Sequence, residues 1–153
     1  MELAIAEAER AAREGEVPVG CVILDRSGLV VGRGYNRREM DQSPLAHAEI
    51  LAIAEASARL GSWRLVDTTL IATLEPCVMC SGAIIQARIP RLVYGCLDPK
   101  GGAIASLYRI ADDPRLNHRV EIVSAVAEER CSRLLTSFFG DLRERKRKRN
   151  RND

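Results

Sequence analysis

Long apolar runs are missing from this 153-residue chain. No stretch approaches the roughly 20 apolar residues that a membrane-spanning helix requires. The opening segment MELAIAEAER carries acidic residues where a secretory signal would carry a basic region. We therefore predict a soluble, cytoplasmic protein with no membrane partner, and its length is that of one domain with a core of its own.

Cysteine and histidine are scarce, with five cysteines and two histidines in the chain. An odd number of cysteines in a cytoplasmic protein argues against a disulfide framework. It leaves the thiols available as metal ligands.

Excess positive charge is absent from most of the chain. The net charge is +2, but residues 143–153 hold seven basic and two acidic residues, so the remainder carries −3. A basic end of this kind is common both as an arm that binds nucleic acid and as a solubilising end. Composition alone does not separate these two uses.

Strand and helix patterns alternate along the chain. Short apolar runs bounded by turn residues predict five strands, at 19–24, 29–35, 68–73, 91–95 and 120–124. Helical spacing predicts helices at 2–14, 46–60, 77–87 and 128–142, and a short helix near 106–110. A hairpin followed by βα alternation predicts a three-layer α/β/α fold, with a mixed five-stranded sheet and helices on both faces. We expect one domain over residues 1–142 and a basic tail, 143–153, that extends the last helix.

Two cysteines stand three residues apart in the segment LEPCVMC, residues 74–80, at the predicted start of a helix. At this spacing Cys77 and Cys80 share one helix face, and the helix N-terminus favours their thiolate forms. His47 lies at the start of the preceding helix, and two thiolates with one imidazole form a zinc-binding set. With three protein ligands, one Zn²⁺ per subunit keeps a fourth position for a water, whose pKa it lowers to about 7.

Glu49 follows His47 by two residues, a spacing at which helical side chains point roughly 200° apart. Both side chains can reach one pocket only at the end of the helix. This suits one metal ligand and one separate proton carrier better than two ligands. We therefore predict Glu49 as the catalytic residue that takes a proton from the activated water and passes it to the leaving group.

Two other uses of the cysteine pair remain open from the residues. A CxxC pair after a strand is also typical of thiol redox sites. A structural zinc site would fill the fourth position with a protein ligand, and the candidates are Cys21, Cys96, Cys131 and His118. The three cysteines lie in or beside apolar segments and are expected to be small core residues, and His118 a packing or hydrogen-bonding residue.

The pattern His-x-Glu followed by Pro-Cys-x-x-Cys is the signature of the zinc-dependent nucleobase deaminases. It is present here as His47-Ala48-Glu49 and Pro76-Cys77-Val78-Met79-Cys80. Over nearly its whole length the chain resembles the bacterial tRNA-specific adenosine deaminases, of the cytidine/deoxycytidylate deaminase superfamily. The matching segments are GEVPVG (15–20), GYNRRE (34–39), AHAEILAI (46–53), LEPCVMCSGAI (74–84), DPKGGA (98–103), LNHRVE (116–121) and LLTSFF (134–139).

This resemblance implies a cytidine deaminase-like fold and hydrolytic, zinc-dependent conversion of a wobble adenosine to inosine. The expected substrate is the anticodon stem-loop of an arginine tRNA with the anticodon ACG. The resemblance also implies a homodimer and no organic cofactor. The residues that it places in contact with substrate are Asn36, Ala46, Asp98, Lys100, Phe139 and Arg143.

Two of these residues have roles in the family. At the position of Asn36 an asparagine hydrogen-bonds the target purine. The position of Asp98 lies beside the sugar of a neighbouring nucleotide, where a 2′-hydroxyl distinguishes RNA from DNA. A turn-capping role for Asn36 and a loop role for Asp98 remain open. Gly101 and Gly102 favour a tight turn, because no GKS or GKT follows them as in a phosphate-binding loop.

Two other functions also remain open. A deaminase of free guanine, cytosine or a nucleoside would use the same zinc ligands. A non-catalytic RNA-binding module stabilised by zinc would have four protein ligands and would leave Glu49 without a task.

Overall fold

The computed structural model describes residues 1–152, except the side chain of Asn152, and its main elements follow the predicted order. The helices are α1 (Glu2–Arg13), α2 (Ala48–Leu60), α3 (Val78–Gln86) and α4 (Glu128–Asn152). The strands are β1 (Gly20–Leu24), β2 (Val30–Tyr35), β3 (Thr69–Leu74), β4 (Arg91–Cys96) and β5 (Glu121–Val123). The short helix expected near 106–110 is wrong, because these residues form turns and irregular backbone.

The five strands form one mixed sheet in the order β2-β1-β3-β4-β5, which confirms the predicted fold class. Strand β1 is antiparallel to both β2 and β3, whereas β3, β4 and β5 are parallel. Strands β2, β3 and β4 therefore end at the same edge of the sheet. The segments that follow them begin at Asn36, Glu75 and Leu97, so these segments meet at that edge.

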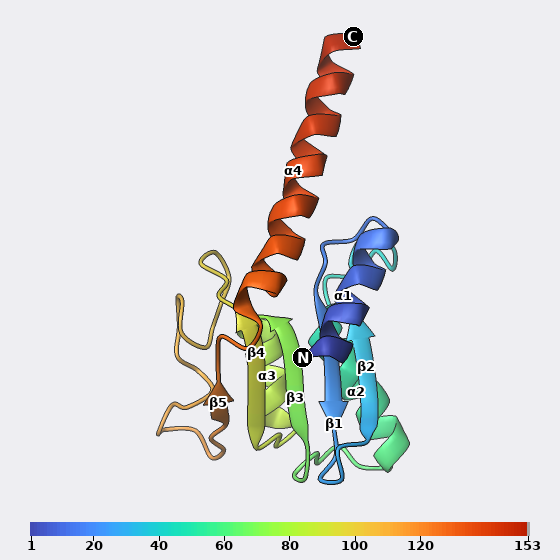
Figure 1. The fold of residues 1–153 in the computed structure, drawn as a ribbon. Helices are drawn as coiled ribbons and strands as arrows, with labels where there is room; N and C mark the ends of the chain where they lie inside the picture. Colours follow the sequence, from blue (N-terminus) through green and yellow to red (C-terminus); the bar gives the residue numbers. More distant parts are fainter. Residues whose placement is uncertain (153) are drawn as a thin grey trace.

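Helices cover both faces of this sheet (Figure 1). Helix α1 packs on β1, β2 and β3, and the start of α4 packs beside it on β4. Helices α2 and α3 lie on the opposite face, where they contact each other and enclose the larger part of the core. Successive residues of β1 show the alternation that a strand requires: Val22 packs with Ala4 of α1, whereas Cys21 and Ile23 pack in the core that contains Ala52 of α2.

Helix α4 has two different halves. Its first turns pack through Cys131, Leu134 and Leu135 against Ile5 and Cys96. From residue 141 to residue 151 every position is exposed, and this half projects from the body of the molecule (Figure 1). Within the described chain, none of the helices combines the length and the apolar character needed to cross a membrane.

Candidate active site

The three predicted zinc ligands converge at the sheet edge where β3 ends. His47 is the N-cap of α2, Cys77 is the N-cap of α3, and Cys80 lies in the first turn of α3. The Nδ1 atom of His47 is 3.7 Å from the Sγ of Cys77 and 3.5 Å from the Sγ of Cys80. The three ligand atoms all lie within 4.8 Å of one another. Ligands that share one zinc ion at about 2.0–2.3 Å come this close together, so we call His47, Cys77 and Cys80 the metal centre.

The charges of the metal centre also fit a divalent cation. The pKa of Cys77 is lowered to about 4, chiefly by a hydrogen bond from Cys80 and further by a hydrogen bond with His47. The contact with Cys77 and then burial raise the pKa of Cys80. The helix N-terminus alone therefore does not ionise both thiols, because two neighbouring thiolates repel each other. A bound divalent cation would remove that penalty and favour the thiolate form of Cys80 as well.

No fourth protein ligand joins the metal centre within residues 1–152. Cys21, Cys96 and Cys131 are buried in the apolar clusters, as expected from their sequence context. The Nε2 atom of His118 lies 2.7 Å from the carbonyl oxygen of Ile89, which is the hydrogen-bonding role expected for it. Three ligands with an open position are typical of a catalytic rather than a structural zinc site.

Glu49 lies beside the metal centre in the first turn of α2, and it is only 4% exposed. His47 precedes the helix with extended backbone angles, φ −80° and ψ 151°, so its side chain does not follow the helical repeat. The side chains of His47 and Glu49 consequently face the same cavity, which their two-residue spacing allows only at the end of a helix. Burial raises the pKa of Glu49 above its usual range, which helps its carboxylate to hold a transferred proton.

A cavity of about 210 Å³ opens beside the metal centre. Asn36 and Asp98, two of the predicted substrate-binding residues, line it together with Glu49. Arg38 also lines the cavity, and its side chain is 54% exposed, so it lies at the mouth. The cavity thus combines apolar walls, a buried carboxylate and a few polar groups, as small-molecule sites do.

The other predicted substrate residues lie outside this cavity. Ala46 is buried beside His47, and its carbonyl oxygen accepts a hydrogen bond from the backbone of Arg37 at 3.0 Å. Lys100 is exposed on the loop after β4. Phe139 and Arg143 are exposed on α4. A ligand that touches these residues as well as the metal centre must be much larger than a nucleobase.

Glu75 is a residue of the site that the sequence analysis missed. It follows β3 directly, lines the cavity and is 2% exposed. Its carboxylate accepts hydrogen bonds of 2.7–3.0 Å from the backbone N–H groups of Asp98, Ile104, Ala105 and Ser106, and another from the Ser106 hydroxyl. Burial acts to raise the pKa of Glu75, but these donors outweigh it and lower the pKa to about 2. Glu75 thereby holds the loop that carries Asp98 against the cavity.

The position of the Glu75 carboxylate explains Gly102 and the missing helix of this loop. A Cβ at Gly102 would lie 2.3 Å from the carboxylate of Glu75, so the position must be glycine. The amides of residues 104–106 point to Glu75 instead of starting a helix. The sequence signal for Glu75 was an acidic residue placed between a buried strand and Pro76.

Glycine also fixes the helix that carries the metal ligand and the carboxylate. A Cβ at Gly34 in β2 would lie 2.0 Å from the carbonyl oxygen of Ala48. The first turn of α2 therefore rests directly on the backbone of β2. This contact sets the position of His47 and Glu49 relative to the sheet edge.

Three metal ligands, an open position and an adjacent buried carboxylate at a small cavity define a zinc-dependent hydrolytic site. Residues 1–96 match the family model of the cytidine and deoxycytidylate deaminase zinc-binding region. The tRNA-specific adenosine deaminase of Streptococcus pyogenes serotype M1 is 48% identical over 147 residues, which cover 96% of this chain and 85% of that protein. The enzyme of the same description from Bacillus subtilis (strain 168) is 45% identical over 152 residues, 99% of this chain and 94% of that protein. The chain therefore belongs to the cytidine and deoxycytidylate deaminase family, in the branch of the tRNA-specific adenosine deaminases.

Solved structures agree with this assignment. One from a study of A-to-I editing by tRNA:A34 deaminases has a TM-score of 0.84 and 44% identity, and the match covers 88% of this chain and 97% of that chain. The guanine deaminase of Bacillus subtilis has a TM-score of 0.62 and 27% identity, over 94% of this chain and 90% of that chain. The cytidine deaminase-like fold is confirmed, and the chain is more similar to the first structure than to the second.

Proposed function

We propose that this chain is a zinc-dependent tRNA deaminase, which converts the wobble adenosine of a tRNA anticodon to inosine. The expected substrate is the ACG anticodon of an arginine tRNA. The observation that carries the proposal is the buried carboxylate of Glu49 beside a three-ligand metal centre with an open position. The choice of adenosine in tRNA over a free base is supported by the high identity to the tRNA enzymes over nearly the whole chain.

His47, Cys77 and Cys80 would hold one zinc ion per subunit, which when bound supplies an activated water by lowering its pKa to about 7. Glu49 acts as the proton carrier. Its carboxylate accepts the proton released as the oxygen adds to C6 of adenine. The same carboxyl then gives a proton to the departing amine, so that the C6–N bond breaks and ammonia leaves.

The target base must leave the stack of the anticodon loop to enter a cavity of about 210 Å³. Unstacking costs less in a single-stranded loop than in a duplex. Asn36 and Asp98 would contact the base and a neighbouring sugar from the cavity wall, with Ala46 and Lys100 on the adjoining segments. The guanidinium of Arg38 at the mouth suits a flanking phosphate.

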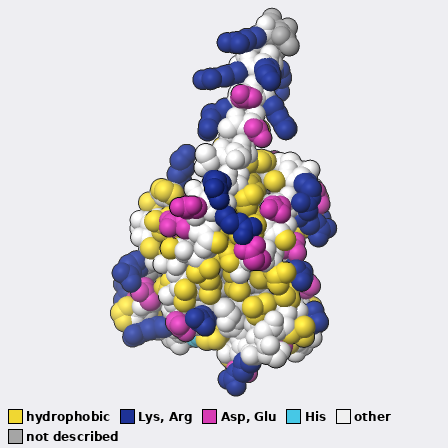
Figure 2. All heavy atoms as spheres, in the orientation of Figure 1, with side chains coloured by type: hydrophobic (Ala, Val, Ile, Leu, Met, Phe, Trp, Pro, Cys, Tyr) yellow, Lys and Arg dark blue, Asp and Glu magenta, His cyan; other side chains and the backbone are white. Residues whose placement is uncertain are grey.

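The projecting end of α4, residues 143–152, which we call the arm, would bind the stem of the same RNA. Figure 2 shows Lys and Arg side chains on several sides of it. Arg145 and Arg149, like Arg147 and Arg151, stand four residues apart, where like charges destabilise a helix. Phosphates of the RNA would neutralise this repulsion, and Phe139 and Arg143 lie where the arm leaves the body.

We further propose that the enzyme is a cytoplasmic homodimer. All five cysteines are free, which suits a reducing compartment. Apolar side chains around the site are available for a subunit contact: Val78, next to Cys77, is 50% exposed, and Leu107 and Tyr108 on the loop after β4 are 53% and 56% exposed. Light scattering on the purified protein tests the dimer.

The test of the function is a side-by-side assay of zinc-loaded protein. The substrates are an ACG stem-loop of arginine tRNA, free adenosine, cytidine and guanine, with ammonia and inosine measured for each. We expect inosine at the wobble position only, no turnover of the free compounds, and a Glu49→Ala variant that keeps zinc but is inactive. Turnover of a free compound with an unchanged stem-loop would instead make the chain a nucleobase or nucleoside deaminase.

A further inference from the structure

The side-chain amide of Asn36 has one fixed orientation. Its Nδ2 atom donates to the carboxylate oxygen Oε2 of Glu16 and to the carbonyl oxygen of Val17, at 3.3 Å each. Both partners are pure acceptors, so a reversed amide would set three oxygen atoms against one another. The hydrogen-bond network therefore decides which end of the amide is nitrogen.

This orientation determines what Asn36 offers to the cavity. The side chain is 9% exposed and lines the cavity. Nδ2 donates to two protein acceptors, and none of the hydrogen bonds among the described residues ends on Oδ1. Asn36 thus presents a hydrogen-bond acceptor, its carbonyl oxygen, and not a donor.

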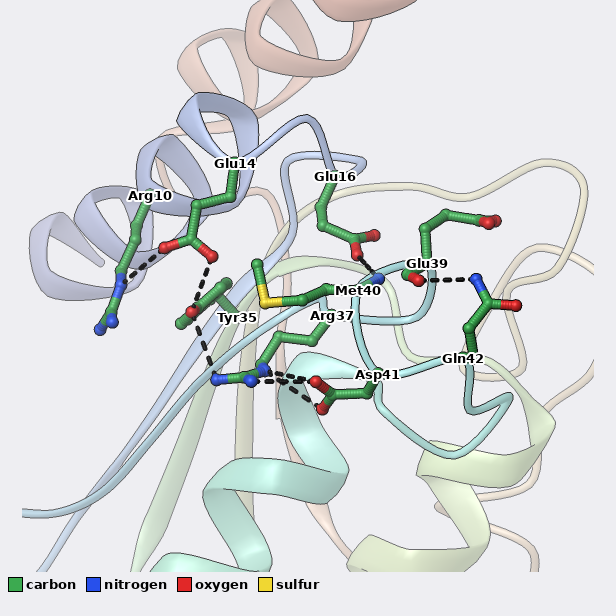
Figure 3. A network of polar contacts seen from close by, with 9 residues as sticks. All are labelled: Arg10, Glu14, Glu16, Tyr35, Arg37, Glu39, Met40, Asp41 and Gln42. Carbon is green, nitrogen blue, oxygen red and sulfur yellow. Dashed lines mark hydrogen bonds and ion pairs between the residues drawn. The ribbon is translucent and has the colours of Figure 1, made fainter.

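Glu16 is buried between two segments that surround the cavity. It lies on the loop between α1 and β1 and is 2% exposed. Its second oxygen, Oε1, accepts a hydrogen bond of 2.6 Å from the backbone N–H of Met40, in the loop that follows Asn36 (Figure 3). One carboxylate therefore holds both the side chain of Asn36 and the loop behind it.

The neighbouring acidic residues do not share this task. Glu14 accepts a hydrogen bond from the hydroxyl of Tyr35 at 3.0 Å, and Asp41 pairs with Arg37 at 2.9 Å (Figure 3). Neither of them is a partner of Asn36. Glu14 and Glu16 are thus two acidic residues on the same short segment, of which one touches the substrate-facing amide and the other does not.

We infer that Glu16 is a positioning residue, which locks the Asn36 carboxamide so that its carbonyl oxygen accepts a hydrogen bond from an N–H or O–H group of the target nucleotide. The inference rests on the proposed function, since it takes Asn36 as a contact of the substrate. Without the carboxylate the amide can turn over and present its NH₂ group, which repels the same donor. The lock therefore contributes to binding geometry and not to proton transfer.

The test is the Glu16→Gln variant, which keeps the size of the side chain. The new carboxamide can accept from Met40, but its NH₂ group then meets the NH₂ group of Asn36, and the Asn36 amide turns to relieve this contact. We expect kcat/KM on the stem-loop to fall about 10- to 100-fold, with wild-type zinc content and melting temperature. The matched control Glu14→Gln should stay within about twofold of wild type.

A double-mutant cycle with Asn36→Ala separates positioning from a merely structural effect. If Glu16 acts through Asn36, adding Glu16→Gln to Asn36→Ala causes no further loss. The inference would be overturned if the fold-losses in kcat/KM of the two single variants multiplied in the double variant, or if Glu16→Gln were as active as wild type. The cycle is repeated with Glu16→Asp, which keeps the charge but is too short to reach both the Asn36 amide and the Met40 backbone N–H. With two different variants at this position, poor folding of one of them does not decide the result.

The same assays distinguish failure of the inference from failure of the proposed function. A wild-type protein that leaves the stem-loop unchanged contradicts the function itself. A wild-type protein that is active while Asn36→Ala is equally active removes Asn36 from the substrate contacts, and the inference about Glu16 falls with it.

Discussion

The metal centre and the arm differ in how their positions are determined. The metal centre lies at the starts of two helices that are packed against the sheet, and neighbouring carboxylates such as Glu75 are enclosed by hydrogen bonds from the chain itself. Every residue of the arm from 143 to 151 is exposed, and none of them belongs to the buried apolar cluster that holds the first turns of α4. The fold therefore positions the metal centre through its own packing, whereas we propose that the charge of the arm is offset only when RNA binds.

This contrast implies that catalysis and RNA affinity are separable in this chain. Side chains of the metal centre should affect the chemical step with little effect on affinity. Side chains of the arm should affect affinity and its salt dependence with little effect on the chemical step.

The largest expected effect comes from removing a metal ligand. Cys77→Ala removes the thiol with the lowered pKa, which is the ligand of the metal centre that ionises most readily. We therefore expect loss of zinc and of detectable inosine formation. Zinc content by elemental analysis and inosine by chromatography check this. Cys131→Ala, which removes a buried thiol from α4 outside the metal centre, should keep its zinc; a Cys77→Ala variant with a full zinc complement and activity would contradict the assignment.

Next in size is the neutralisation of the arm. A variant with Arg145, Arg147 and Arg149 replaced by glutamine should bind the stem-loop about 10- to 100-fold more weakly near 0.1 M salt. The slope of log K against log salt should flatten by about two to three, since each lost phosphate contact removes about 0.7–0.9. Filter binding at several salt concentrations measures both.

The control for the arm is Arg26→Gln, because Arg26 lies in the turn between β1 and β2 and pairs with Asp67 at 2.6 Å. It removes one positive charge without touching α4. If it weakened binding as much as the arm variant does, the arm would have no special role.

A smaller effect contrasts the strand that supports the metal centre with the helix that continues into the arm, by the same Gly→Ala substitution in each. Gly34→Ala forces a Cβ against the backbone of α2, and we expect the free energy of unfolding to fall by about 2 kcal/mol, as overpacking does. Gly140→Ala places a Cβ in open space within α4 and should stabilise that helix by about 0.5–1 kcal/mol. Chemical denaturation of both variants is the measurement, and equal effects would show that α2 is not held by this contact.

The smallest effect concerns the link between β5 and α4. Ala125 has a φ of +61°, in the left-handed region that favours glycine. Ala125→Gly should therefore raise the free energy of unfolding by about 1 kcal/mol. Ala54→Gly, at an exposed position inside α2, should lower it by about the same amount, so two changes of the same kind should have opposite signs.

The sequence was enough to predict the parts of the molecule that depend on local spacing. The interval between Cys77 and Cys80, and the position of His47 before a helix, predicted the metal centre. The order of apolar runs predicted a mixed five-stranded sheet. These features follow from the helical and strand periodicities, so no long-range contact is needed to infer them.

The parts that the sequence did not reveal depend on contacts between distant segments. The helix expected near 106–110 is absent because three amides of this loop bond to Glu75, about 30 residues earlier in the chain. The link between Glu16 and Asn36 spans 20 residues. The spatial order of the strands and the close contact at Gly34 likewise follow only from the assembled sheet.

The most direct test of the separation between metal centre and arm is the single-turnover rate of inosine formation at saturating stem-loop. It should be measured for the wild type, for Glu49→Gln and for the variant with three neutralised arginines in the arm. We predict that the arm variant reaches the wild-type rate once the RNA saturates it, whereas Glu49→Gln is slower by about 10²- to 10⁴-fold. Two results would contradict the separation of metal centre and arm. One is an arm variant whose single-turnover rate stays well below the wild-type rate even at saturating RNA. The other is a Glu49→Gln variant that reacts at the wild-type rate.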